Sequence, residues 1–306
     1  MTITRRTLLE MGAGAGAVTT LGIRPVSAQQ APLVQKTIPK TGESVAPIGI
    51  GTNRYGVGTA EEERAPLRAT LKLFAEQGGK IIDTAAVYGT AETVIGDLVR
   101  ELGVRDRLFF ATKTDLRRQV RGAAGLEQRF ERMQTEVMDL MQVHNLVDAA
   151  NELAVMREWK QEGRIRYVGA TISTPNQYEE MARAMETEEM DFVQFNYSLD
   201  DRGAADRLLP LALNLGLAVL INLPFGRGDL FEKVEGQTLP EWAAEFDCES
   251  WGQFFLKYII SHPAVTAAIP GTRQERHVID NLGAARGRLP DADFRRRQEQ
   301  FFDALS

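Results

Sequence analysis

Eight short apolar segments alternate with segments of helical periodicity along most of this chain, and this alternation restricts the possible fold most. Strands that are separated by helices run parallel in one sheet, because each helix returns the chain to the same edge. Eight such units without a central change in composition favour a closed (β/α)8 barrel, or TIM barrel. The predicted strands are residues 48–52, 80–84, 108–112, 138–143, 165–171, 192–195, 218–222 and 266–269.

An open doubly wound sheet is the alternative architecture, and its glycine fingerprint is missing. A dinucleotide-binding sheet of that type carries Gly-x-Gly-x-x-Gly between its first strand and first helix. The chain has Gly49, Gly51, Gly56 and Gly58 in this region, but the spacing does not match, and residues 55–60 are typical of a loop. The barrel is therefore preferred.

Segments on both sides of the barrel complete the predicted organisation. Residues 31–46 are typical of a β-hairpin, and residues 291–305 of a charged amphipathic helix that caps the barrel on its outside. We therefore expect a single barrel domain over residues 29–306. The predicted helices between the strands are residues 61–76, 91–102, 125–136, 148–161, 177–186, 204–215 and 250–261.

Residues 1–28 are predicted to be a leader peptide outside this fold. Arg5 and Arg6 begin a charged region, residues 11–23 are weakly apolar, and Val26-Ser27-Ala28 offers the small residues at which a signal peptidase cuts. This order is typical of a twin-arginine export signal. An uncleaved anchor is the alternative, but the apolar run is shorter than the roughly 20 residues that span a bilayer. We expect the twin-arginine machinery to export the protein to the periplasm or another extracytoplasmic compartment, without stable membrane insertion after cleavage.

Charge and cysteine content argue against several classes of partner and site. The chain has 36 Lys and Arg against 42 Asp and Glu, so no basic surplus is available for nucleic-acid phosphates. Its single cysteine, Cys248, excludes an intramolecular disulfide and any multi-Cys metal site. No His-Asp-Glu cluster has the spacing of metal ligands, which disfavours a metal-dependent enzyme. A small-molecule substrate remains the expected partner.

Polar side chains stand at or just after the ends of three successive strands. Asp83 and Tyr88 follow the second strand, Lys113 the third and His144 the fourth. In a barrel these ends face one shared cleft. Each residue also has a purely structural explanation: a buried ion pair for Asp83 and Lys113, a packed aromatic for Tyr88, and a core histidine for His144. Their combination favours a catalytic site.

A longer series of motifs resembles the aldo-keto reductase family. The resemblance extends from about Lys36 to the C-terminal helix. It implies a (β/α)8 oxidoreductase that reduces an aldehyde or ketone with a nicotinamide cofactor, or catalyses the reverse. The motifs are Gly49-Ile-Gly-Thr52, residues 83–92, Phe110-Ala-Thr-Lys113, Asp139-Leu-Met-Gln-Val-His144, Gly163-Arg-Ile-Arg-Tyr-Val-Gly169, Val193-Gln-Phe-Asn-Tyr197, Pro224-Phe-Gly-Arg-Gly228 and Ile269-Pro-Gly-Thr272 with Asn281.

The resemblance assigns a role to each of the four strand-end residues. Tyr88 is the general acid that protonates the carbonyl oxygen of the substrate. A nearby ammonium on Lys113 favours the phenolate and so moves the pKa of the phenol, ordinarily near 10, toward a useful range. Asp83 keeps Lys113 charged and oriented, and His144 positions the carbonyl oxygen by a hydrogen bond.

Cofactor contacts follow from the same resemblance, with four departures from the family pattern. Ile172 replaces an Asn and Asn222 replaces a Tyr at the nicotinamide end; Gly271 replaces a Lys and His277 an Arg at the adenosine end. Arg273 is suited to a ribose 2′-phosphate, which favours NADP(H) over NAD(H). The expected cofactor-binding residues are Thr52, Asp83, Thr171, Gln194, Asn222, Leu223, Phe225, Gly271, Thr272, Arg273 and Asn281.

Two functions of different classes remain open at this point. The first is the reductase, and the second is a nucleotide-binding regulatory or sensor protein that keeps the barrel but has little turnover. The four strand-end residues favour the enzyme, whereas Ile172 and Asn222 permit the alternative. The substrate is not determined, because the expected pocket walls are loops: residues 53–57, 116–122 and 199–202, with Leu146.

Overall fold

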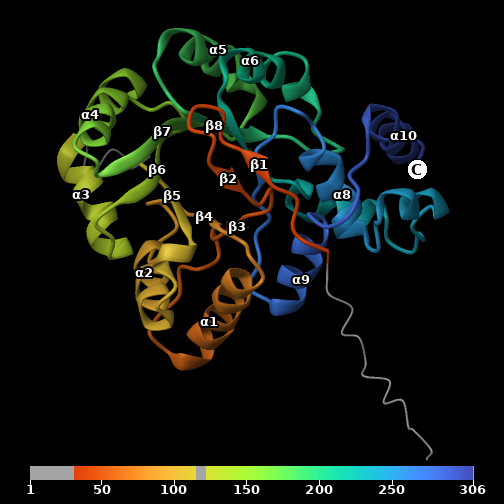
Figure 1. Cartoon of the computed structure of the whole chain (residues 1–306), viewed down its shortest axis with the longest axis horizontal. Helices are drawn as coiled ribbons and strands as arrows, with labels where there is room; N and C mark the ends of the chain where they lie inside the picture. The colour runs from red at the N-terminus through yellow and green to blue at the C-terminus, as the bar shows by residue number, and fades with distance from the viewer. Residues whose placement is uncertain (1–30, 115–121, 306) are drawn as a thin grey trace, which may run out of the picture. The chain divides into compact units, whose positions relative to one another are not determined.

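The computed structural model describes residues 31–114 and 122–305 (Figure 1). Residues from Pro32 onward form one compact unit. The predicted leader peptide and residues 116–121 of the expected pocket wall lie outside the described part of the chain. Within that part, no helix has the length and apolar character that crossing a membrane requires.

Eight parallel strands form one sheet in sequence order, from β3 at one edge to β10 at the other. The edges then meet: the amide of Gly49 donates to the carbonyl of Ala268 at 2.9 Å, and the amide of Gly51 donates to that of Pro270 at 3.0 Å. This closure confirms the predicted (β/α)8 barrel. The strands are β3 (Ile50–Gly51), β4 (Ile81–Asp83), β5 (Phe109–Lys113), β6 (Met138–His144), β7 (Ile165–Thr171), β8 (Phe192–Asn196), β9 (Ala218–Asn222) and β10 (Ala267–Ala268).

Helices surround the barrel (Figure 1), and each of them contributes at least one buried apolar side chain to the main core cluster. Two differ from prediction. The third begins at Gly122 instead of residue 125, and it ends at Met133 instead of residue 136 because Gln134 adopts a left-handed conformation with φ 50°. The sixth begins at Leu208, which places Pro210, a residue without an N–H donor, in the first turn. The helices are α1 (Glu61–Glu76), α2 (Ala91–Leu102), α3 (Gly122–Met133), α4 (Ala149–Gln161), α5 (Tyr178–Thr187), α6 (Leu208–Leu215), α7 (Asp229–Lys233), α8 (Trp251–Ile260), α9 (Glu275–Gly283) and α10 (Ala292–Asp303).

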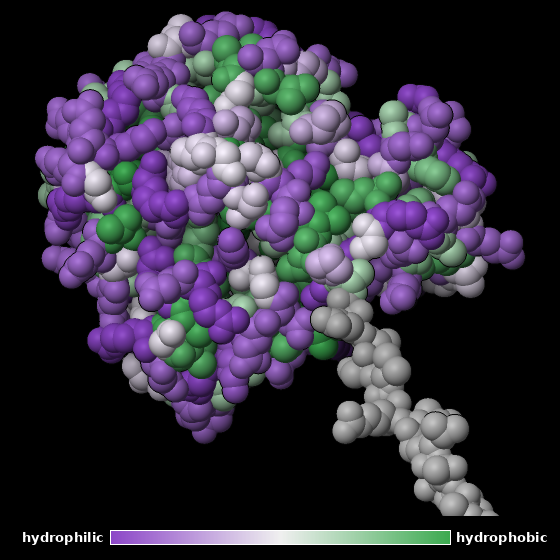
Figure 2. All heavy atoms as spheres, viewed as in Figure 1, coloured by the Kyte–Doolittle hydropathy of each residue, from purple (hydrophilic) through white to green (hydrophobic). Residues whose placement is uncertain are grey.

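The predicted hairpin and C-terminal helix are both present. Strands β1 (Lys36–Thr37) and β2 (Ser44–Val45) pair antiparallel, and Ile38 and Val45 join the apolar cluster inside the barrel. Helix α10 packs against α8 on the outside, where the side-chain amide of Gln298 donates to the carbonyl of Phe254 at 2.9 Å. The side of the molecule that carries the hairpin is mostly hydrophilic in Figure 2.

The barrel interior changes from apolar to polar along the strand direction. Near the hairpin, the rings of Phe109, Tyr167 and Phe192 fill the interior, with ring centroids 5.3–5.9 Å apart. At the carboxyl ends of the strands, buried polar side chains replace them, among them Lys113 and Gln194. Since a packed core needs no such groups, this end of the barrel is where a functional site is expected.

Candidate active site

Asp83 and Lys113 form a buried ion pair at the ends of neighbouring strands β4 and β5. The Lys113 ammonium lies 2.8 Å from each carboxylate oxygen of Asp83 and also donates to the Thr84 carbonyl at 2.7 Å. The two residues are 4% and 3% exposed. All three ammonium protons therefore have acceptors, and the position of the charge is fixed.

Tyr88 lies in the loop after β4, with the Lys113 ammonium 5.9 Å from its ring centroid. A turn closed by the amide of Tyr88 and the carbonyl of Ala85 sets its position. Gly56 belongs to the loop after β3, and a Cβ atom there would lie 2.4 Å from the Tyr88 carbonyl oxygen. Only glycine allows this approach, so the two loops hold the phenol beside a buried cation.

His144 ends β6, and its backbone amide donates to the Thr114 hydroxyl at 3.1 Å. Its imidazole is almost wholly buried. Three nearby residues, Asn145, Leu146 and Asp148, have positive φ angles of 51°, 57° and 61°. Left-handed conformations cost a non-glycine residue free energy and concentrate at functional sites. The strain marks this loop as part of the candidate site.

The four predicted catalytic residues therefore lie at the same end of three neighbouring strands. The structural explanation is true for one pair, because Asp83 and Lys113 do form a buried ion pair. It does not explain the aromatic side chain of Tyr88 near that pair, or the strained turn after His144. The roles assigned to these residues remain predictions.

The expected nicotinamide end contains three linked side-chain amides. Gln194 on β8 hydrogen-bonds to Gln142 on β6 and to Asn222 at the end of β9, each at 2.6 Å. Thr171 is buried at the end of β7. The side chain of Ile172, which stands at the position of the family Asn, is buried in the apolar layer between sheet and helices.

Gln142 is a polar residue of this region that the sequence analysis did not single out. It precedes His144 by two positions on one strand, so both side chains face the same side of the sheet. That period of two was visible in the sequence and would have identified it.

The expected adenosine end is built from the segments after β10. Gly271 pairs with Gly51 across the barrel closure, and the Thr272 carbonyl accepts a hydrogen bond from the Tyr55 hydroxyl at 3.1 Å. Arg273 is exposed and has no ion pair within the described residues. Burial raises the pKa of Tyr55, and the nearby Arg273 guanidinium partly offsets that effect. Arg273 is thus available to an anionic ligand.

The remaining predicted cofactor residues lie on the same elements. Thr52 is buried and its hydroxyl donates to the Asp83 carbonyl at 2.8 Å. Leu223 follows β9 with a positive φ of 47°, and Phe225 packs its ring 5.0 Å from that of Phe231. Asn281 is buried on α9, whereas His277 on the same helix is exposed.

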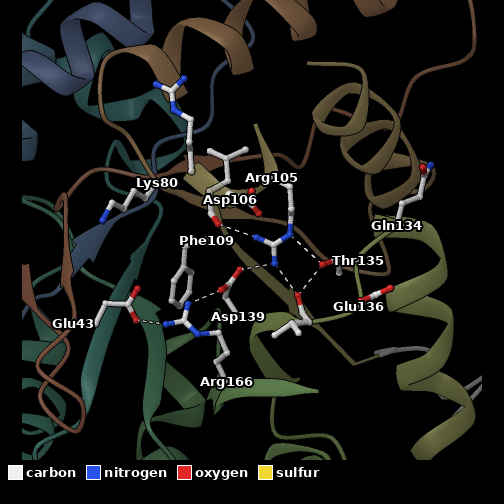
Figure 3. A pocket seen from close by; sticks show the side chains of 13 residues that line it. Glu43, Lys80, Arg105, Asp106, Phe109, Gln134, Thr135, Glu136, Asp139 and Arg166 are labelled. Carbon is white, nitrogen blue, oxygen red and sulfur yellow. Dashed lines mark hydrogen bonds and ion pairs between the residues drawn. The ribbon is translucent and has the colours of Figure 1, made fainter. Parts of the chain in front are cut away.

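A cavity of about 690 Å³ opens at the other end of the strands (Figure 3). Four of its charged groups form one network: Arg105 and Arg166 both bind the Asp139 carboxylate, at 2.9 and 2.6 Å, and Arg166 also binds Glu43 of the hairpin. Active sites of this fold lie at the carboxyl ends of the strands. This network therefore fastens the hairpin to the barrel, and we do not assign it the chemistry. The described residues also contain no group of three or more His, Cys, Asp or Glu suited to a metal ion.

The chain is similar to known proteins in both sequence and structure. A family model described as "Aldo/keto reductase family" matches residues 47–300. Aldo-keto reductase YhdN of Bacillus subtilis (strain 168) is 29% identical over 215 residues, which is 62% of this chain and 64%, slightly under two thirds, of that protein. Aldo-keto reductase str7 of Strobilurus tenacellus is 26% identical over 304 residues, covering 83% of this chain and 88% of that one.

Solved structures share the barrel. The crystal structure of an aldo/keto reductase from Klebsiella pneumoniae, in complex with NADP and acetate, has a TM-score of 0.75 and 24% identity. The similarity covers 88% of this chain and 96% of that one. At this level of identity the similarity shows that the two chains share a fold.

The buried ion pair gives a prediction about stability. Asp83→Leu leaves the Lys113 ammonium buried without a counter-charge, so we expect the free energy of unfolding to fall by about 3–5 kcal/mol. Adding Lys113→Met removes the stranded charge and should restore most of that loss. Urea unfolding measures the free energy of unfolding of the single and the double variant.

A surface pair provides the control. Glu61→Gln removes an exposed partner of Arg68 and should change the free energy of unfolding by no more than about 1 kcal/mol. A double variant that is less stable than Asp83→Leu alone would contradict this account of the pair.

Proposed function

This chain belongs to the aldo/keto reductase family, and from that premise we propose that it reduces an aldehyde or ketone to an alcohol, or catalyses the reverse, with Tyr88 as the proton donor. The observation that carries this proposal is the Lys113 ammonium, held by Asp83 and lying 5.9 Å from the Tyr88 ring centroid. A phenol beside a fixed cation, at the end of the barrel where substrates bind, is suited to acid–base chemistry on a carbonyl.

Each side chain has a distinct task in this proposal. The Lys113 ammonium lies beside the Tyr88 ring and can stabilise the negative charge that develops on the phenol oxygen as its proton passes to a carbonyl oxygen. Asp83 keeps the ammonium in place with both of its oxygens. His144 lies on the next strand and supplies an imidazole that positions the carbonyl oxygen by a hydrogen bond.

A nicotinamide cofactor fits the polar groups at this end of the barrel. When bound, it supplies the hydride that the reaction needs. The partly buried amide of Asn222 suits its carboxamide, and the exposed Arg273, near the start of α9, suits the ribose 2′-phosphate. We therefore propose NADP(H) over NAD(H), and the NADP complex of the Klebsiella pneumoniae protein supports this choice.

We also propose export by the twin-arginine route to an extracytoplasmic compartment. Arg5 and Arg6, the weakly apolar segment and the small residues ending at Ala28 support it. That route carries folded proteins, so the barrel closes around NADP(H) in the cytoplasm, where the cofactor is made. A ligand present at a hundredfold excess over its Kd stabilises the folded state by about 2.7 kcal/mol.

Removal of the Tyr88 hydroxyl tests the chemistry. We expect Tyr88→Phe to lower turnover of a reducible carbonyl by about 10²–10⁴-fold while NADPH still binds, because proton donation is lost and the fold is kept. Loss of NADPH absorbance over a carbonyl panel measures turnover. Tyr167→Phe, at the hairpin end of the barrel, is the control and should keep wild-type turnover. Unchanged turnover in Tyr88→Phe would remove Tyr88 from the mechanism.

Removal of the Arg273 guanidinium tests the cofactor preference. We expect Arg273→Ala to weaken NADPH binding by ~1–3 kcal/mol, the scale of a charge-assisted hydrogen bond, and to leave NADH binding nearly unchanged. Arg276→Ala, an exposed arginine on α9, is the matched control. Equal losses for both cofactors would show that Arg273 does not read the phosphate.

Lysine substitutions of Arg5 and Arg6 test the twin-arginine export route. The Arg5→Lys and Arg6→Lys double variant should hold the precursor in the cytoplasm, whereas Arg24→Lys in the same leader should not. Cell fractionation measures the distribution, and denaturation of the exported protein should release NADP(H). Continued export of the double variant contradicts the route, and exported protein without cofactor contradicts loading before export.

A further inference from the structure

Three side-chain amides form a continuous hydrogen-bonded chain across the carboxyl end of the barrel. The amide nitrogen of Asn222 donates to the backbone carbonyl of Ile172 at 3.0 Å. The amide nitrogen of Gln194 donates to the Asn222 side-chain oxygen, and that of Gln142 donates to the Gln194 side-chain oxygen, each at 2.6 Å. The chain thus connects the ends of β7, β9, β8 and β6.

One backbone group fixes the direction of the whole chain. The Ile172 carbonyl can only accept, so Asn222 must turn its nitrogen toward it and its oxygen toward Gln194. Gln194 must then present nitrogen to Asn222 and oxygen to Gln142. The result is visible at the far end, where the side-chain oxygen of Gln142 is buried and has no partner within the described residues.

Burial ranks the three amides by their access to a ligand. Gln194 and Gln142 are both 0% exposed, whereas Asn222 is only partly buried. Gln194, which stands at the family position for the nicotinamide carboxamide, therefore lies behind Asn222. The accessible end of this hydrogen-bonded row of amides is therefore Asn222, the residue that replaces the family tyrosine.

We propose that Asn222, and not Gln194, is the amide that contacts the carboxamide of the cofactor, and that Gln194 and Gln142 are positioning residues behind it. This inference rests on the proposed function. After its two hydrogen bonds, Asn222 keeps one N–H and one oxygen lone pair. A primary carboxamide offers one carbonyl oxygen and an NH2 group, so the two amides are complementary.

The proposal also connects the two departures at the nicotinamide end. Ile172 lacks the side-chain amide of the family Asn, and its side chain is turned into the apolar layer. Its backbone carbonyl is nevertheless the anchor of the Asn222 amide. The amide lost after β7 is thus supplied from the end of β9, two strands away in the sheet, and it is oriented by the Ile172 carbonyl.

A cofactor analogue tests the contact without measuring turnover. In 3-acetylpyridine adenine dinucleotide phosphate, a methyl ketone replaces the carboxamide, so the N–H donors are lost. Isothermal titration gives the Kd of this analogue and of NADP⁺ for the full-length protein. We expect wild type to prefer NADP⁺ about three- to tenfold, the scale of one neutral hydrogen bond. Asn222→Leu should bring the ratio to about one, and Gln194→Leu should lower it in part.

A neighbouring amide provides the matched control. Asn196 pairs with Asn222 in the sheet register and donates to the backbone carbonyl of Ser173 at 3.0 Å, but it does not belong to the chain. Asn196→Leu should keep the wild-type ratio. Asn222→Ala, which introduces no larger side chain, serves if Asn222→Leu does not fold, as judged by circular dichroism.

The outcomes separate this inference from the proposed function. The role of Asn222 is overturned if the preference for NADP⁺ over the analogue survives loss of the Asn222 amide. It is also overturned if Gln194→Leu abolishes that preference and Asn222→Leu does not. Either result leaves the proposed reductase function intact. Equal Kd values of the wild-type protein for the analogue and for NADP⁺ also overturn the role of Asn222. Failure of wild type to bind either dinucleotide overturns the proposed function and this inference with it.

Discussion

The buried ion pair between Asp83 and Lys113 is the interaction on which the site depends. Removing two charges from water is costly, and it is tolerated only where their hydrogen bonds are replaced. Here both carboxylate oxygens and all three ammonium protons are used, with the Thr84 carbonyl completing the set. Because β4 and β5 are neighbours in the barrel, the pair also holds the loop of Tyr88 in one position relative to the sheet.

The barrel separates stability from chemistry along its axis. The hairpin end is filled by the stacked rings of Phe109, Tyr167 and Phe192 and covered by Ile38 and Val45. A charged network centred on Asp139 fastens that end. The opposite end keeps buried polar groups and strained loops, which packing alone does not require. The packed hairpin end stabilises the fold, so the opposite end can hold buried polar groups and strained loops that cost folding free energy.

The polar end is organised by backbone groups as much as by side chains. The Ile172 carbonyl orients a chain of three amides, and the Asp83 carbonyl accepts the Thr52 hydroxyl. A carbonyl oxygen has two lone pairs, so it can accept a side-chain donor even where it also accepts a backbone amide, as the Asp83 carbonyl does from Thr52. Replacing a side chain at one of these positions therefore changes the groups that can contact a ligand, but the backbone carbonyl that orients the neighbouring side chains stays.

The sequence by itself determined the barrel and the residue types of the candidate site. The alternation of strand and helix gave all eight strands, and the positions of Asp83, Tyr88, Lys113 and His144 after strand ends placed them on one face, because parallel strands end at one edge. It did not give the end of α3 at Met133 or the start of α6 at Leu208, since single turns at Gln134 and Pro210 decide those boundaries. Only the tertiary structure decided which of the three amides a ligand can reach. Gln142, Gln194 and Asn222 are far apart in the chain, and their order from buried to accessible depends on barrel curvature and on one carbonyl that can only accept.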